Sequence, residues 1–334
     1  MAPGNVRVRR QTDRGSDAGP RHVRANGVVL FVQRGGQRLR QLEYDFGTDS
    51  FTSGDMTELA DHVAGAGFVE AAYQSVPDGV WWGVRADGTL ATFTFDREQR
   101  VRGWSRQVLG GTDAKVESVA VVPSPDGTSE DVYLSVTRTI NGATVRTIEF
   151  IRSAFRADIE GAAAGFFVDC GLTYSGTPAT TFSGLNHLEG ETVQLVGDGA
   201  VRQSQQVTGG AVSATGPASA VMHIGLPYRS TLNTLPPEAG AAAGSAQGQP
   251  KRITEVSIRL ADSAGGRISR GSNSDAIVLR ELSMPMSKAV PLFTGLVSMP
   301  FPAGWDSEGQ LTITSNAPLP LTVVAIISDL DTNG

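Results

Sequence analysis

The sequence predicts an all-β protein: a propeller-like β-meander module, then a small β-barrel or sandwich, and then a C-terminal β region. Three observations support this prediction. The 334 residues include 40 glycines and 17 prolines, which indicates many tight turns. Apolar and polar residues alternate with a period of two in most stretches. Three consecutive stretches also share the length and plan of propeller blades.

The first of these stretches combines residues 28–32 with residues 39–46, across a Gly-Gly turn. In its second half Leu42, Tyr44 and Phe46 alternate with acidic residues. This alternation is the pattern of a strand with one face buried.

The second stretch joins residues 80–85 to residues 89–95 through Asp87-Gly88. An Asp-Gly pair between two β-rich runs is a strong hairpin signal, and it predicts a type I′ turn with a positive φ at Gly88. Trp81 and Trp82 are adjacent, so they point to opposite faces of the strand. We expect one of them in the core and the other exposed, where it could stack on a sugar.

The third stretch contains three apolar runs, at residues 116–122, 132–138 and 144–150, separated by turns that include Asn141-Gly142. With the residues that flank its runs, we interpret each of the three stretches as a meander of roughly 35–45 residues, the period of a propeller blade. Three blades do not close an ordinary propeller, which has about 4–8. Either further blades come from elsewhere or the array is open.

Between the first two stretches we expect a short helix at residues 55–63, with Asp55 and Glu58 forming a capping box.

The patterns described so far divide the chain into six parts. The parts are a basic N-terminal arm at 1–26, the propeller-like module at 27–152, a linker at 153–164, a barrel or sandwich at 165–235, an Ala/Gly-rich loop at 236–250 and the C-terminal β region at 251–334.

The charge distribution argues against a dedicated nucleic-acid-binding protein. The formal net charge is -6, whereas such proteins carry a basic footprint. Residues 1–25 are the exception, and we interpret them as a solvated arm or as a contact with a neighbouring subunit or DNA. The positive side chains of this segment are Arg7, Arg9, Arg10, Arg14, Arg21 and Arg24. We expect the acidic body to bind duplex DNA weakly or not at all at physiological salt.

Cys170 is the sole cysteine, so no disulfide forms within the chain. It lies in an apolar run, where a buried structural thiol is expected rather than a nucleophile. No apolar run follows Met1, so no signal peptide is expected. No stretch approaches the roughly 20 apolar residues of a membrane span.

The motifs of common active sites are missing from the sequence. The four histidines form no H-E-x-x-H pair, and no C-x-x-C exists, so no metal site of standard spacing is predicted. Ser183 lies near His187 but lacks the G-x-S-x-G context of a serine hydrolase. Residues 244–251 lack the Gly-Lys-Ser/Thr ending of a phosphate-binding loop. The remaining histidines are His22, His62 and His223.

Paired carboxylates could serve a glycosidase as acid and base, but solvated surface groups are the more common explanation in β-proteins. The pairs are Glu189 with Glu191 and Glu130 with Asp131. We therefore predict no catalytic residues, no cofactor and no metal, and a protein that is not an enzyme.

Several segments resemble a family of phage and prophage tail proteins related to podovirus tail-nozzle and tail-hub subunits. The resemblance covers most of the chain after residue 27 and rests on structural motifs rather than catalytic ones. The matching segments are residues 28–36, 42–46, 82–90, 116–121, 138–142, 167–174, 187–193, 223–228 and 251–253.

This resemblance implies a structural subunit near the distal end of a short tail. Such a subunit would form a closed ring of six copies around the DNA-ejection channel and hold other tail components, namely an adaptor, fibres or a plug. Genomic DNA would pass through without specific binding. The expected location is the virion, after assembly in the bacterial cytoplasm. Family members are longer at the N-terminus, so the chain would correspond to their C-terminal part.

Two other functions fit the sequence. One is a tail-associated module that binds a receptor or a glycan through its β-rich surface. The other is an enzyme without a recognisable motif, such as a polysaccharide depolymerase.

Overall fold

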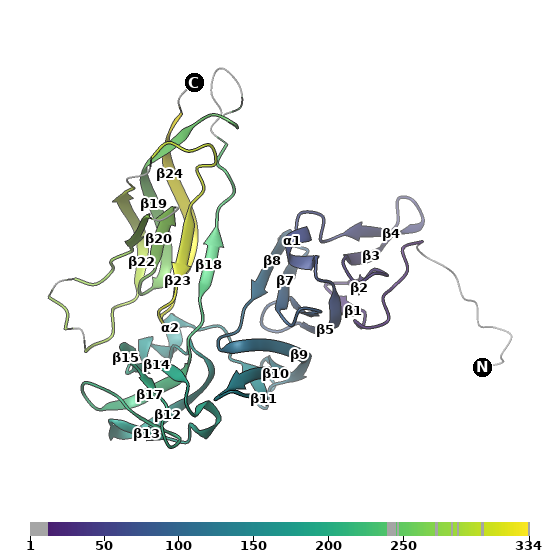
Figure 1. Ribbon diagram of the computed structural model, residues 1–334. Coiled ribbons are helices and arrows are strands. Elements are labelled where there is room, and N and C mark those ends of the chain that lie inside the picture. Colours follow the sequence, from purple (N-terminus) through teal and green to yellow (C-terminus); the bar gives the residue numbers. More distant parts are fainter. Residues whose placement is uncertain are drawn as a thin grey trace, which may run out of the picture. The chain divides into compact units, whose positions relative to one another are not determined.

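The computed structural model describes residues 13–238, 245, 247–270, 273–281, 283–285, 287–301 and 304–332. The chain divides into two units, Met1–Ser153 and Ala154–Gly334. Antiparallel sheets make up nearly all of both units, and helix is limited to short segments. The predicted all-β fold, with a propeller-like module before further β-structure, is confirmed (Figure 1).

The first unit contains three consecutive antiparallel meanders, in which neighbouring strands of the sequence are also neighbours in the sheet. The first sheet is β1 (Val23–Ala25), β2 (Val28–Val32), β3 (Leu39–Asp45) and β4 (Ser50–Asp55). The second sheet is β5 (Phe68–Gln74), β6 (Val80–Arg85), β7 (Leu90–Asp96) and β8 (Val101–Gln107). The third sheet is β9 (Thr112–Pro123), β10 (Glu130–Ile140) and β11 (Ala143–Ile151).

The second unit begins with the short helix α2 (Ala157–Glu160) and a 3-10 turn, and continues into the predicted barrel or sandwich. One of its sheets has the order β12-β17-β14-β15, and β13 pairs with β16. The bounds are β12 (Asp169–Ala179), β13 (Thr181–Ser183), β14 (Thr192–Gly197), β15 (Ala200–Gln206), β16 (Ala211–Ser213) and β17 (Ser219–Leu226).

Two further sheets, in the orders β18-β23-β20-β21 and β22-β19-β24, form the C-terminal β region around one apolar core. Strands β23 and β24 follow each other in the sequence but lie in different sheets. The bounds are β18 (Ser230–Asn233), β19 (Lys251–Ser263), β20 (Arg267–Arg270), β21 (Asn273–Ala276), β22 (Phe293–Pro300), β23 (Thr312–Ser315) and β24 (Thr322–Thr332).

The predicted helix at 55–63 is wrong over most of its length. Asp55 ends strand β4, and the helix α1 (Asp61–Ala64) begins six residues later with no side-chain cap. The Asp55 carboxylate accepts hydrogen bonds from the amide and hydroxyl of Thr57, at 2.8 and 2.6 Å. An aspartate bonded two residues ahead makes a turn rather than a helix start.

The boundary of the basic arm also needs correction. Strand β1, at Val23–Ala25, belongs to the first sheet, because it pairs with β2 across Asn26-Gly27. Both turn residues have positive φ, of 47° and 82°, as a type I′ hairpin requires. Residues 1–12 of the predicted arm lie outside the described residues, as do residues 239–244 and 246 of the predicted Ala/Gly-rich loop.

The turn at Asp87-Gly88 is a hairpin, but not the predicted type I′. Gly88 has a φ of 85°, whereas Asp87 does not have a positive φ. The Gly88 amide donates to the Arg85 carbonyl at 2.9 Å, and the Arg85 amide donates to the Thr89 carbonyl at 3.0 Å. A single left-handed residue at the end of a longer loop is the G1-bulge arrangement.

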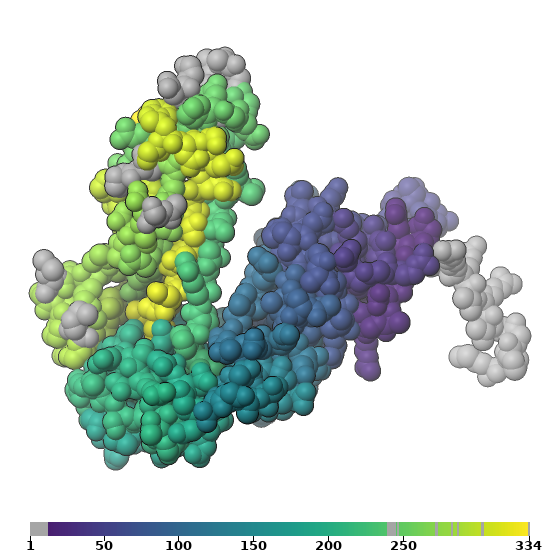
Figure 2. All heavy atoms as spheres, in the orientation of Figure 1, coloured from purple at the N-terminus to yellow at the C-terminus, as the bar shows by residue number. Residues whose placement is uncertain are grey.

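The second sheet is buried on both faces, and this fixes the order of the three sheets. One core cluster joins Trp81, Phe93 and Phe95 to the first sheet and α1. A separate cluster joins Trp82 and Leu90 to the third sheet. The expectation that one tryptophan is exposed is therefore wrong, because each face of β6 has its own neighbouring sheet. Drawn as spheres, the side chains of the first unit, in purple to blue, close the space that the ribbons leave between its sheets (Figure 2).

The close approach of the third sheet to Gly88 predicts a large cost for a side chain there. A Cβ at Gly88 would lie 2.6 Å from the Cβ and Cγ of Lys115, and the Gly88 carbonyl accepts from the Val116 amide at 2.8 Å. Gly88→Val should lower the free energy of unfolding by roughly 1–3 kcal/mol.

Urea denaturation checks this, with Gly127→Val as the matched control. Gly127 also has a positive φ, of 69°, in a hairpin of the same unit, but its Cβ would meet nothing within 4 Å. Equal losses for the two variants would show that the contact with Lys115 contributes nothing.

Candidate assembly surface

The third sheet has one covered and one uncovered face. Alternate residues of β10 pack into the cluster shared with the second sheet, led by Val132, Leu134 and Val136. The residues between them point away from that cluster. One face of the third sheet therefore packs against the second sheet, and the other face points away from it.

The uncovered face carries apolar side chains. Tyr133 lies directly opposite Phe150, and their ring centroids are 6.0 Å apart. The exposed fractions are 37% for Tyr133, 60% for Phe150 and 72% for Ile148. With Val122, these residues define the third-sheet outward face. The central strands β6 and β7 of the second sheet are largely buried on both faces, whereas its edge strand β8 is exposed.

A surface ion pair lies at the other end of this face. The Arg146 guanidinium donates to the Glu117 carboxylate at 2.5 and 2.8 Å. Arg146 lowers the pKa of Glu117 through these hydrogen bonds. Both groups are largely exposed, so the pair contributes little to folding and leaves a polar border beside the apolar residues.

The inner face of the third sheet is held by a buried ion pair. The side chain of Arg138 is 1% exposed, and both of its terminal nitrogens donate to the Glu149 carboxylate. Arg138 Nε also donates to the Gly110 carbonyl at 2.7 Å. This contact fastens the start of β9 to β10 and β11, so the sheet is rigid behind its outward face.

Removing one partner of this ion pair should cost more than removing both. Glu149→Ala leaves the Arg138 charge buried without its carboxylate, and it should lower the free energy of unfolding by about 3–5 kcal/mol. The double variant Arg138→Met with Glu149→Ala should recover part of that loss. Denaturant titration measures both, and a double variant that is less stable than the single one contradicts this account.

The first sheet also carries exposed aromatic residues on the face that points away from the second sheet. Tyr44 lies opposite Phe51, with ring centroids 5.4 Å apart. Their exposed fractions are 46% and 42%. Tyr44 and Phe51 define the first-sheet outward face. Both end sheets of the first unit therefore present a cross-strand Tyr–Phe pair.

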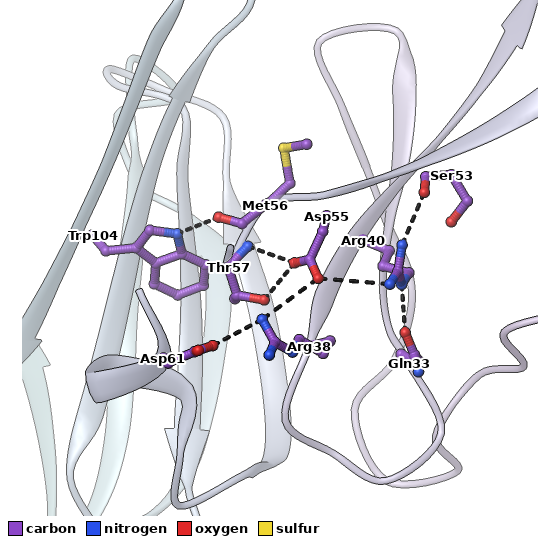
Figure 3. Close-up of polar contacts among 9 residues, drawn as sticks. All are labelled: Gln33, Arg38, Arg40, Ser53, Asp55, Met56, Thr57, Asp61 and Trp104. Carbon is purple, nitrogen blue, oxygen red and sulfur yellow. Dashed lines mark hydrogen bonds and ion pairs between the residues drawn. The ribbon is translucent and has the colours of Figure 1, made fainter. Parts of the chain in front are cut away.

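A polar network lies at the other end of the first sheet (Figure 3). The Asp55 carboxylate is 3.6 Å from guanidinium nitrogens of Arg38 and of Arg40, and Arg38 also pairs with Asp61 at 2.8 Å. Trp104 Nε1 donates to the Met56 carbonyl at 2.8 Å. The network connects β4 and α1 to the second sheet, so it positions the first sheet rather than forming a reactive centre.

The histidines considered as ligands have other roles. His22 and His62 are exposed. His223 is buried, and its two ring nitrogens lie 2.9 Å from the Thr173 hydroxyl and 2.9 Å from the Ala163 carbonyl. Among the described residues, no group of three His, Cys, Asp or Glu side chains could hold a metal ion.

Ser183, His187 and Cys170 do not form a nucleophilic centre. His187 Nε2 lies 3.0 Å from the backbone carbonyl of Cys170, and Ser183 belongs to the pairing of β13 with β16. Cys170 is half-buried rather than buried, at a backbone φ of 48°.

The carboxylates considered as acid–base pairs hold turns together. Glu130 accepts hydrogen bonds from the Ser75 and Val76 amides, at 2.5 and 3.3 Å. Glu189 accepts from the amides of Gly209 and Gly210, at 2.9 and 2.7 Å. Carboxylates fixed to backbone amides in this way stabilise loops.

Residues 244–251 were considered as a phosphate-binding loop. Lys251 opens strand β19 and donates to the Ser307 carbonyl at 3.3 Å, whereas residues 244 and 246 of the loop before it lie outside the described residues.

In the part of the chain that the structure describes, no helix is long and apolar enough to cross a membrane.

Comparison with known proteins gives structural matches alone. No family model and no curated protein matches the sequence. The solved structures include two variants of the exo-beta-1,3-galactanase from Phanerochaete chrysosporium with beta-1,3-galactotriose, at 11% identity to this chain. They cover 90% and 92% of this chain, which spans 65% and 80% of theirs, at TM-scores of 0.21 and 0.23.

The function predicted from the resemblance is corrected by this comparison. The solved structures named here are galactanases and not phage-tail proteins, so the predicted tail-nozzle subunit is contradicted. The TM-scores are too low for the galactanases' activity or ligand to be transferred to this chain. The family resemblance itself, the six-copy ring and the virion location stay predictions.

Proposed function

We propose that the chain is a non-enzymatic structural protein that assembles with copies of itself through the third-sheet outward face. The observation that supports this most is the contrast between sheets of the same plan. The second sheet buries both of its faces, whereas the third sheet leaves Tyr133, Ile148 and Phe150 uncovered. Contiguous exposed apolar residues on a rigid sheet are typical of interaction surfaces.

The polar side chains of the first unit support a structural role. Arg138, Glu130 and Asp55 are each engaged in contacts that join one strand or sheet to the next. These contacts make the first unit rigid. An assembly surface needs this rigidity, because ordering a flexible surface on binding costs affinity.

A charge placed in the third-sheet outward face should abolish self-association. Ile148→Glu would bury a carboxylate without a partner in the assembled state, and it should weaken association at least tenfold. Sedimentation velocity over a concentration series measures this. A wild-type chain that stays at its monomer mass of 35.0 kDa at every concentration contradicts the proposal.

Ile159→Glu is the matched control. Ile159 lies on α2 and is 72% exposed, the same fraction as Ile148, so the two substitutions change charge and exposed apolar area alike. The control should associate as the wild type does. If both variants lose association to the same degree, the effect comes from net charge and not from this face.

A further inference from the structure

We infer that the partner surface is the first-sheet outward face of a second copy, so that two chains pack head to tail and close a propeller of six sheets. This inference rests on the proposed self-assembly and specifies its geometry. It follows from what the described residues place at the two ends of the first unit.

The chain already shows what covers a meander face in this protein. Twice in succession, the face of one antiparallel meander packs against the face of the next, around Trp81 and then around Trp82. The third-sheet outward face is the next surface in that series. Another meander of the same kind would pack on this face in the same way, and a second copy of the chain provides such a meander.

The first sheet offers the matching surface. Tyr44 and Phe51 stand on directly opposed residues of β3 and β4, as Tyr133 and Phe150 do on β10 and β11. Aromatic residues bring large contact areas and prefer offset or edge-to-face neighbours, which a face-to-face packing of sheets supplies. The two end faces thus carry the same exposed cross-strand pair, which on the first sheet lies at the hairpin end of the face, beyond the buried Phe31 and Arg40.

The number of sheets sets the number of copies. One copy contributes three meanders, which is below the range of about 4–8 that closes a propeller. Two copies contribute six, which is within it. A head-to-tail contact repeats until the rotation closes, and closure after two copies leaves no uncovered end face. The expected particle therefore has twice the monomer mass of 35.0 kDa and does not grow further, in place of the six-copy ring that the family resemblance implies.

A mixing experiment tests the head-to-tail arrangement with full-length variants. Ile148→Glu damages the third-sheet outward face, and Phe51→Glu damages the first-sheet outward face. Each variant alone should associate at least tenfold more weakly than the wild type. An equimolar mixture should regain dimers, because one intact third-sheet face then meets one intact first-sheet face. Native mass spectrometry with one variant isotopically labelled identifies the mixed dimer.

Other results overturn the inference without overturning self-assembly. If Phe51→Glu dimerises like the wild type while Ile148→Glu does not, two third-sheet faces pack against each other. If the wild type forms particles that keep growing beyond two copies, the six-sheet closure is wrong. Circular dichroism and the melting temperature of each variant, compared with Ile159→Glu, show whether a loss of association is instead a loss of folding, and an unfolded Phe51→Glu is replaced by Tyr44→Ser.

Discussion

The burial of the second sheet on both faces is the constraint on which the rest of the first unit depends. Trp81 and Trp82 are neighbours in β6, so they project to opposite sides, and each needs its own apolar cover. The first sheet covers one side and the third sheet covers the other. A chain that stacks meanders in this way has an uncovered face at each end unless the stack closes on itself.

The polar contacts are placed where they make that stack rigid. Asp55 with Arg38 and Arg40 holds the first sheet beside α1, and Glu130 holds the third sheet to the loop after β5. Arg138 with Glu149 fixes the inner face of the third sheet. The charged groups thus maintain the shape of the surfaces at the two ends, and in the proposed assembly the apolar residues on those surfaces would supply the driving force for association.

The sequence predicts the β-class and seven of the eleven strands of the first unit, because period-two alternation and Gly-containing turns are local signals. Strands β1, β4, β5 and β8 were missed, since their residues alternate weakly and are recognised only by pairing with neighbours. The helix at 55–63 was predicted from a capping pattern, but Asp55 ends strand β4 and its carboxylate accepts from Thr57 in a turn instead. The candidate assembly surface had a partial signal, because residues 132–134 are all apolar and Ile148 and Phe150 alternate with Glu149, but one sheet alone cannot show which set is covered.

The most direct measurement is the solvent accessibility of the four aromatic rings as the protein concentration rises. Hydroxyl-radical footprinting with mass spectrometry reads Tyr44, Phe51, Tyr133 and Phe150 separately, and the exposed Phe46, at the hairpin beyond β3, serves as an internal reference. The account predicts that all four become protected together as dimers form, while Phe46 changes less. Labelling of the four rings that is the same at every concentration would contradict it.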